Sequence, residues 1–563
     1  MNEKHMQYVL TVLKEGSFTN AAKKLYVSQP SLSQIIKTAE SNLGAPIFDR
    51  STDPITLTPA GQLYVEAARQ VTTISTNLVK QVEELSNEEF GKIRLGISVQ
   101  RGMELLPELY PRFKKRFPHV EIELPGDPMK FTAVPNAIKG KGIWAASGVN
   151  EKNVGMTATE TITSNARVLG ADPLVKLQPA EDGKEEAAGG IGEEDLVYIT
   201  LPYISSAREG VIRLGSLLEK YGTYEMNGIA FQDAGEIWWL ETIGGHHWIA
   251  KRVPDDRYVV MPNQFGIDEF DLNDAFSEQK EHMCSSDLRE FIAENHLDLS
   301  LNGGNGSHFD ARAAFGSHSD SDHIYNTPRA WFMCRYFNPH TKKWDGPDAD
   351  YTPESDDIPW SMVPEKKITV EDVKYVLSSH YQGTPYDPYA AYGDKSWKGA
   401  YRSIGVNRTD FLSVIQMRPD HKGDNGILQW IAFASNAFNV LVPFYTDVTT
   451  TPEYLSNTTG EVSTDNFYWA SRMIAAMADA SYKSSIFHIE RYQEKVMAKG
   501  HALIHQYDAL LAGETDEAKQ TQLREEANNK IAEMLKKETG ATLHKVLFEL
   551  SNQMKNAYSR SDA

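Results

Sequence analysis

Two groups of histidine and carboxylate side chains are of the types that bind metal ions in proteins. The first is the adjacent pair His246 and His247, which falls on an expected strand. Because neighbouring strand residues point to opposite faces, we expect each histidine to pack or make one hydrogen bond, not to share an ion. The second group is a loop that holds His318, Asp320, Asp322 and His323. Its spacing matches no standard zinc or calcium site, so a polar loop beside a pocket is favoured, and neither a metal nor a cofactor is predicted.

The thiols of Cys284 and Cys334 are the only two in the sequence of 563 residues. Cys284 precedes an expected helix at 287–295, whose dipole would lower a thiol pKa, so it is a candidate nucleophile. Cys334 follows Trp331–Phe332 and is expected in the core. Two cysteines cannot form a disulfide framework, which is typical of a reducing compartment.

No apolar run approaches membrane-spanning length, so a cytoplasmic protein that does not enter the membrane is predicted.

The elements that must position these side chains form a mixed chain after residue 125. Alternating and apolar runs predict strands at 142–146, 154–159, 229–233, 236–241, 246–252, 257–261, 404–417 and 428–442. The four strands from 229 to 261 are expected to form one antiparallel meander. Helical spacing predicts helices at 205–221, 287–295, 370–379, 467–512 and 516–557. The last two helices are expected to form a terminal hairpin, and the mixture predicts an α+β class.

The first 58 residues read as a winged helix-turn-helix. A first helix ends at Gly16, a short helix spans 20–25, and a third helix runs from a Ser28 cap to Gly44. A short two-stranded wing follows at 46–50 and 55–58. This order of elements is typical of DNA-binding domains.

The polar side of the third helix has the chemistry to read base edges, through Gln29, Ser31, Ser33 and Gln34. Cations that can contact phosphates are Lys23, Lys24, Lys37 and Arg50. Because the net charge is -20, any DNA contact must come from such a local patch. The alternative, on periodicity alone, is a three-helix packing domain whose polar face is simply solvated.

The next helix, 59–89, carries a narrow apolar stripe at three- and four-residue steps: Val71, Ile74, Leu78, Val82 and Leu85. Such a stripe predicts a coiled-coil contact between two chains, and hence a homodimer or higher oligomer. A helix packed on its own domain is the alternative.

The residues of the head closely resemble one family. FTNAAKKLYVSQPSLSQIIKTAESNLGAPIFDR followed by LTPAG is similar to the DNA-binding head of LysR-type transcriptional regulators. The resemblance implies DNA as a partner, with Gln29, Pro30, Ser31, Ser33 and Gln34 in or beside the major groove, and a linker helix that makes the dimer. Residues 91–124 look like the opening of the LysR effector domain, which breaks off at Leu124 and so lacks an inducer pocket.

The chain from about Leu124 onward closely resembles the PepD-like cysteine dipeptidases. The resemblance rests on the segments Ile143–Val175, Asp233–Ile267, Phe309–Trp331, Gly383–Tyr389 and Tyr401–Pro419. It implies an N-terminal-nucleophile hydrolase fold of αββα layers that cleaves dipeptides without a cofactor. In such enzymes an N-terminal cysteine attacks the scissile carbonyl, and its own α-amino group is the base.

The same resemblance implies roles for three residues. Asn263 fits the asparagine of the oxyanion hole, Arg329 fits an arginine that helps set the charge of the thiolate, and Glu160 falls near the position that completes the hole. The structural alternatives are that Asn263 caps a turn and that Arg329 pairs with Asp320 or Asp322.

The chain departs from the dipeptidase pattern at the junction Val120–Pro125. The LysR-like piece occupies the place of the segment that carries the nucleophile, and no cysteine lies in residues 1–283. The expected domains are 1–58 (winged helix-turn-helix), 59–90 (linker helix), 91–124 (effector fragment), 125–460 (truncated hydrolase core) and 461–563 (terminal helices). Three hypotheses follow: a dipeptidase-family hydrolase with impaired catalysis on a DNA-binding head, a regulator with a non-catalytic body, or a chimera without function.

Overall fold

A computed structural model describes residues 3–49, 55–65, 67–68, 91–94, 120–123, 128–138, 144–178, 189–301, 306–419, 421 and 426–555. The chain divides into two compact units, Met1–Gly126 and Asp127–Ala563.

The first unit begins with three helices and a wing. These are α1 (Glu3–Glu15), α2 (Phe18–Lys24), α3 (Gln29–Leu43), β1 (Phe48–Asp49) and β2 (Thr56–Leu57). The Ser28 hydroxyl caps α3 by accepting from the Ser31 N–H at 3.3 Å, and Gly44 ends the helix at φ +79°. Leu32, Ile36 and Ala39 of α3 are buried against the other helices. The predicted helix-turn-helix is therefore confirmed, with α2 beginning two residues before the predicted start.

The part of the first unit after the wing is described only in pieces. Residues 59–65 and 67–68 are helical, as predicted for the linker helix. Its apolar stripe, Val71 to Leu85, lies outside the described residues, as does Arg50. Strands β3 (Gly91–Arg94) and β4 (Val120–Glu123) pair with each other in parallel, with Ile93 opposite Ile122.

The second unit is built on a seven-stranded antiparallel sheet of order β13-β10-β9-β8-β7-β6-β5. Its strands are β5 (Phe131–Ala133), β6 (Ser147–Asn150), β7 (Gly155–Thr161), β8 (Asn227–Gln232), β9 (Ile237–Ile243), β10 (His247–Arg252) and β13 (His282–Cys284). Helix α8 (Ala207–Tyr221) packs on one face through Val211 and Leu214. Gly210 permits this close approach, because a Cβ there would lie 2.4 Å from the Phe231 ring.

A second sheet of order β16-β17-β18 lies against the first. Its strands are β16 (Phe411–Met417), β17 (Ile427–Phe433) and β18 (Val442–Tyr445). The Gln429 side chain donates to Ser147 Oγ at 3.0 Å, and the Gln232 side chain donates to the Ile415 carbonyl at 3.0 Å, so the two sheets are in contact.

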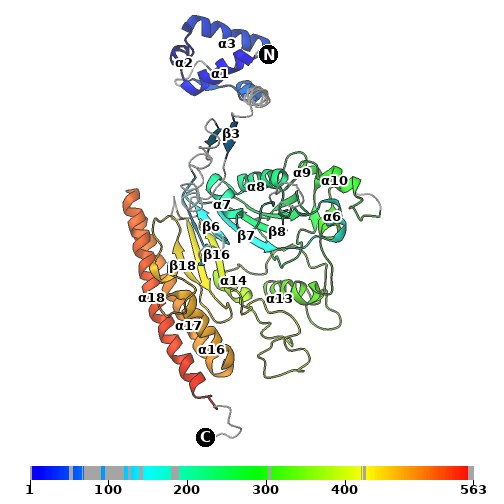
Figure 1. Cartoon of the computed structure of the whole chain (residues 1–563), viewed down its shortest axis with the longest axis vertical. Coiled ribbons are helices and arrows are strands. Elements are labelled where there is room, and N and C mark those ends of the chain that lie inside the picture. Colours follow the sequence, from blue (N-terminus) through cyan, green and yellow to red (C-terminus); the bar gives the residue numbers. More distant parts are fainter. Residues whose placement is uncertain are drawn as a thin grey trace. The chain divides into compact units, whose positions relative to one another are not determined.

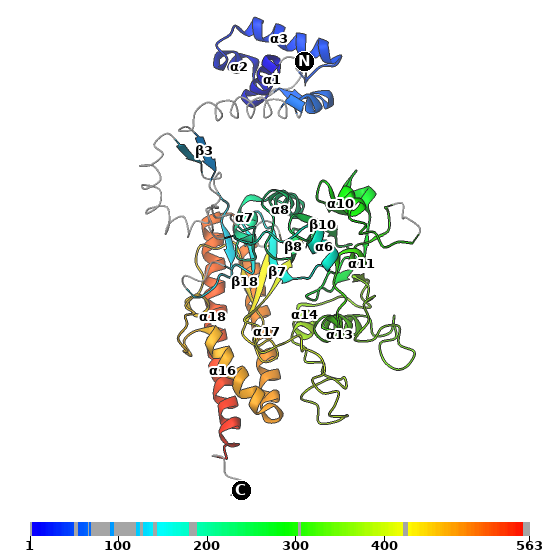
Figure 2. The same cartoon turned by 45° about the vertical axis from the view of Figure 1, so that its right-hand side comes forward.

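Three long helices cover the outer side of the smaller sheet: α16 (Phe467–Ala480), α17 (Tyr482–Leu511) and α18 (Glu517–Ser551). Figures 1 and 2 both show these orange-to-red helices running beside the yellow strands, while α8 covers the cyan strands. The second unit thus has four layers, helix, sheet, sheet and helix, which confirms a mixed α/β body with C-terminal helices.

The remaining short elements complete the second unit. The helices are α6 (Ala166–Ala171), α7 (Leu196–Thr200), η1 (Leu201–Tyr203), α9 (Leu272–Ala275), α10 (Leu288–Glu294), α11 (Ala311–Phe315), α12 (Asp322–Tyr325), α13 (Thr327–Phe337), α14 (Val370–Leu377) and α15 (Glu453–Ser456). The strands are β11 (Tyr258–Val259), β12 (Glu269–Phe270), β14 (Phe309–Asp310) and β15 (Ser361–Met362).

Several sequence predictions for the second unit were wrong in detail. The strands predicted at 404–417 and 428–442 are shorter, since β16 begins at Phe411 and β17 ends at Phe433. The strand predicted at 142–146 is β6, which begins at Ser147. Segment 257–261 does not continue the meander, since β11 pairs with β15 and β13 takes the place beside β10. The helix predicted at 467–512 is broken at Ser481, whose hydroxyl donates to the Met477 carbonyl and whose backbone leaves the helical region.

Candidate functional site

Asn263 and Arg329, predicted separately for a catalytic site, are joined by a hydrogen bond. Arg329 Nη2 donates to Asn263 Oδ1 at 2.7 Å, although 66 residues separate them. Asn263 Nδ2 in turn donates to the Thr161 carbonyl at 3.1 Å. Thr161 ends β7 and directly follows Glu160, whose backbone pairs with Gly228. The structure therefore brings Asn263 and Arg329 together, beside the strand that carries Glu160.

A buried carboxylate orients Arg329 through one intermediate residue. Arg329 lies in the first turn of α13 and also donates to Asn326 Oδ1 at 2.8 Å and to the Tyr325 carbonyl. Asn326 Nδ2 donates to Asp322 Oδ1 at 2.5 Å. Burial opposes the charge of Asp322, but hydrogen bonds from Ser319, Asn326 and Ser317 outweigh it and hold the pKa of Asp322 below its ordinary value. The alternative of a direct Arg329–Asp322 pair is replaced by this relay.

A second buried carboxylate holds the loop that carries Asn263. Glu241 on β9 is fully buried and accepts from Gly266 N at 2.7 Å, Ile267 N at 3.2 Å and Trp239 Nε1 at 3.0 Å. Arg312 Nε donates to the Gly266 carbonyl at 3.1 Å from the other side. Burial raises the pKa of Glu241 to about 7, despite the hydrogen bonds and the nearby Arg312, which lower it.

Glu241→Gln is expected to remove a pH dependence of stability near neutrality. The folded pKa of about 7 lies above the ordinary 4.5, so folding favours the protonated acid. The contribution of this group is complete below pH 4.5 and is lost as the pH rises through 7, by up to about 3 kcal/mol. Urea unfolding at pH 5 and pH 8 should show a larger loss of stability for the native chain than for the variant. Equal losses of stability in the two proteins would contradict the raised pKa of Glu241.

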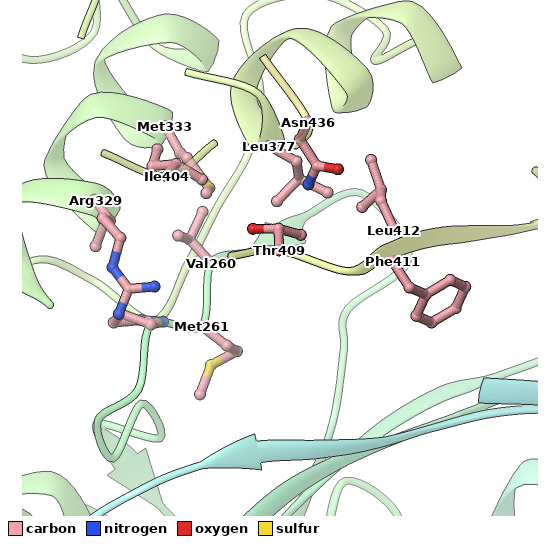
Figure 3. A pocket seen from close by; sticks show the side chains of 12 residues that line it. Val260, Met261, Arg329, Met333, Leu377, Ile404, Thr409, Phe411, Leu412 and Asn436 are labelled. Atoms are coloured by element: carbon pink, nitrogen blue, oxygen red, sulfur yellow. The ribbon is translucent and has the colours of Figure 1, made fainter. Parts of the chain in front are cut away.

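A cavity of about 210 Å³ adjoins Arg329 (Figure 3). It is lined by Val260, Met261, Pro262, Arg329, Ala330, Met333, Leu377, Ile404, Thr409, Phe411, Leu412 and Asn436. Most of these side chains are apolar, and they come from the loop before Asn263, from α13 and α14, and from the start of β16. A mostly apolar cavity with a few polar groups is typical of a small-molecule site.

The two adjacent histidines converge on one carboxylate, which corrects the prediction that they face apart. His246 Nδ1 lies 3.0 Å and His247 Nδ1 lies 2.7 Å from the two oxygens of Asp172. His246 precedes β10 and belongs to a turn, so strand alternation does not apply to it. Burial opposes the charge of Asp172, yet the hydrogen bonds from His247 and His246 lower its pKa to about 2.

The side chains of the histidine and aspartate loop pair with other protein groups. His318 Nδ1 and His323 Nε2 lie 3.7 and 3.2 Å from Asp356, while Asp322 is occupied by its serine and asparagine donors. Across the described ranges, no group of three or more histidine, cysteine, aspartate or glutamate side chains is arranged to hold a metal ion.

Neither cysteine has the surroundings of a nucleophile. Cys284 lies on β13 opposite Ile249, and burial raises its pKa to about 12. This corrects the prediction that a helix dipole lowers it, because the thiol sits within the sheet and α10 begins only at Leu288. Cys334 is in the core, as predicted, and burial likewise raises its pKa to about 12. Neither residue lines the cavity beside Arg329.

The polar side of α3 is open to solvent. Gln29, Pro30, Ser31, Gln34 and Lys37 are exposed, and Ser33 is half-buried. Lys23 and Lys24 are exposed at the end of α2, and Lys24 Nζ lies 2.6 Å from Glu15. Apart from Arg50, which lies outside the described residues, and Ser33, which is half-buried, the residues predicted to contact bases and phosphates are exposed.

Sequence reasoning missed Glu241, Arg312 and Asn436. A buried glutamate within a strand and an asparagine in a loop have no local pattern that marks them. Only the tertiary contacts reveal that Glu241 and Arg312 hold the Gly266 backbone.

No helix among the described residues is long and apolar enough to cross a membrane.

Two solved structures of LysR-type proteins resemble a part of the chain. A crystal structure of the BenM DNA-binding domain with catB site 1 DNA is 31% identical, covering 15% of this chain and 92% of that one, with a TM-score of 0.15. CbnR, a LysR family transcriptional regulator, is 26% identical, covering 22% and 43%, with a TM-score of 0.16.

Relatives of known description cover most of the chain. A dipeptidase of Bifidobacterium longum (strain NCC 2705) is 51% identical over 525 residues, which is 86% of this chain and 97% of the relative. Probable dipeptidase A of Streptococcus pyogenes serotype M18 (strain MGAS8232) is 48% identical over 489 residues, covering 86% and 95%.

Two family models match separate parts of the sequence. The model for bacterial regulatory helix-turn-helix proteins of the lysR family matches residues 4–62. The model for Peptidase family C69 matches residues 105–495, which is more than half of the chain. The chain therefore belongs to peptidase family C69 and carries a LysR-family helix-turn-helix domain at its N-terminus.

Proposed function

We propose that this protein is a dipeptidase-family hydrolase body on a DNA-binding head, with hydrolysis impaired because the nucleophilic cysteine is missing. One observation carries the proposal. Asn263 and Arg329 are assembled beside a cavity, yet both thiols are buried with pKa values of about 12, and residues 1–283 hold no cysteine.

The substrate class in this proposal is a dipeptide, and no cofactor takes part. The identity to dipeptidases supports it, as does the four-layer arrangement of the body, which agrees with an N-terminal-nucleophile hydrolase fold. Asn263 would hold the developing oxyanion, Glu160 would complete that hole, and Arg329 would set the charge of a thiolate. The Asp322–Asn326 relay would hold Arg329, and Glu241 would hold the Gly266 backbone in the loop after Asn263.

The test is to measure dipeptide hydrolysis by the purified chain and by its Cys284→Ser variant. We expect turnover at or near the background of the assay for both proteins, because a thiol of pKa about 12 is almost entirely protonated at pH 7. Robust turnover that Cys284→Ser leaves unchanged would overturn the proposal that the nucleophile is missing. It would also exclude Cys284 as a substitute for that nucleophile. Turnover that Cys284→Ser abolishes would make Cys284 the nucleophile.

We also propose that the head binds DNA as a homodimer through α3. The exposed row of Gln29, Ser31, Gln34 and Lys37 favours this function, since amide and hydroxyl groups can reach base edges in the major groove. The body would then be carried to DNA whether or not it hydrolyses dipeptides.

Gln34→Ala is expected to relax sequence preference, while Lys37→Ala should weaken binding to all DNA alike. A glutamine that reads a base contributes about 1–3 kcal/mol of discrimination, which is about fivefold to a hundredfold in relative affinity. A lysine on a phosphate should instead lower the salt slope by about one. The full chain is first used to select sites from random DNA, and both variants are then titrated on selected and unselected duplexes. An equal loss on both duplexes for Gln34→Ala would exclude it as a base reader.

A further inference from the structure

The cavity beside Arg329 contains a buried amide that points into it. Asn436 is 4% exposed, and its Oδ1 accepts from Asn439 Nδ2 at 3.1 Å. Asn439 Nδ2 also has the carbonyls of Phe433 and Ala434 as acceptors, at 2.8 and 3.0 Å, so its two hydrogens are shared among three oxygens, and only an oxygen of Asn436 can face it. Since Asn436 Oδ1 is thereby the acceptor, its Nδ2 must be the end that faces the cavity, as Figure 3 shows. Within the described residues that Nδ2 has no hydrogen-bond partner.

The backbone of Asn436 is held by a buried lysine. Lys374 of α14 is 5% exposed, and its Nζ donates to the Asn436 carbonyl at 2.5 Å and to Ser378 Oγ at 2.6 Å. A side chain fixed from both its backbone and its amide oxygen is pre-organised, so a ligand that accepts from Nδ2 does not have to order it.

The cavity offers a second hydrogen-bond donor, which is a hydroxyl, and an apolar wall. The Thr409 hydroxyl is directed into the same space in Figure 3, between Val260 and Leu377. The rest of the wall includes Met333, Ile404 and Leu412. A volume of about 210 Å³ is what about seven water molecules occupy in the liquid, at ~30 Å³ each. This volume suits one aliphatic side chain and the carbonyl beside it.

We propose that this cavity is a subsite for one aliphatic side chain of a short peptide, with Asn436 Nδ2 donating to an oxygen of that peptide. That the ligand is a peptide rests on the proposed function. The preference for an aliphatic residue and the role of Asn436 rest on the cavity itself. Asn436 and Thr409 are specificity-determining residues, and neither replaces the missing nucleophile.

Calorimetric titration of the full chain with leucyl-leucine and with glycylglycine tests the subsite. Burying one leucine side chain favours leucyl-leucine, so we expect it to bind about tenfold more tightly or better. Equal affinity for the two dipeptides, or no binding of leucyl-leucine, would overturn the proposal.

Asn436→Asp tests the amide, because it removes the donor and keeps the shape. We expect affinity for leucyl-leucine to fall about five- to tenfold. The matched control is Asn552→Asp, which makes the same charge change at an exposed residue after α18 and should bind as the native chain does. Thr409→Val is a second variant in case Asn436→Asp does not fold. It is expected to weaken binding about two- to tenfold, which is what one neutral hydrogen bond contributes. Native affinity in both folded variants would overturn the role of the donors.

The result of the binding test for this subsite can be distinguished from the result of the turnover test for the proposed function. If the native chain does hydrolyse dipeptides, the impaired catalysis is refuted, and the same preference is then read from the KM values for the two dipeptides. If turnover is absent and leucyl-leucine binds selectively, both proposals are supported.

Discussion

Replacing residues 1–124 with the N-terminal segment of a C69 dipeptidase is expected to raise dipeptide turnover at least ~10³-fold over the native chain. The reason is that a catalytic frame without its nucleophile retains only a small part of the full rate. In the native chain the proposed frame is the hydrogen-bonded Asn263–Arg329 pair with two nearby carboxylates, Asp322 and Glu241. Steady-state kinetics on one dipeptide with both purified proteins measures the effect.

The control for this exchange is the same graft with its N-terminal cysteine changed to serine. That protein carries every restored strand and lacks only the thiol, so it should remain close to the native chain. A folded graft with no gain in turnover would mean that residues 125–563 do not hold a competent site. A gain that the serine control shares would mean that the thiol is not the missing element.

Asn263→Ala in the grafted chain is expected to lower kcat by about 10²-fold or more with little change in KM. Loss of one oxyanion donor typically has this effect, because the donor acts on charge that develops in the transition state. Asn263 Nδ2 already donates one hydrogen to the Thr161 carbonyl, and an amide nitrogen carries a second. Asn552→Ala, at the exposed end of α18, is the matched control and should leave kcat unchanged. A kcat within threefold of the unmodified graft would remove Asn263 from the oxyanion hole.

The head was predictable because its signals are local. Ser28 before Pro30 marks where α3 begins, and Gly44 marks where it ends, and each acts within one helical turn. The apolar spacing of Leu32, Ile36 and Ala39 follows the helical period and does correspond to the buried side.

The proposed catalytic roles of Asn263 and Arg329 rest on family resemblance and stay a prediction. Asn263 and Arg329 meet across 66 residues, and nothing in their immediate sequence indicates this. Asn326, which links Arg329 to Asp322, was not foreseen, because the expected partner was a carboxylate itself.

The prediction that His246 and His247 point to opposite faces of a strand failed because a turn contains His246. Gly244, at φ +57°, turns the chain so that His246 leaves the strand and His247 begins it. The backbone N–H group and the ring Nδ1 of each histidine then lie within hydrogen-bond distance of the carboxylate of Asp172. Asp172 lies 74 residues before His246. Adjacent residues share a partner when a turn, and not a strand, contains one of them.

Thiol labelling of the native full-length chain at pH 7 tests the missing nucleophile most directly. Two thiols are present, and burial holds the pKa of each at about 12. A chromogenic disulfide reagent should therefore label neither cysteine within minutes in the folded protein and both after denaturation. Rapid labelling of Cys284 or Cys334 in the folded chain, followed by loss of a measurable dipeptidase activity, would contradict the account.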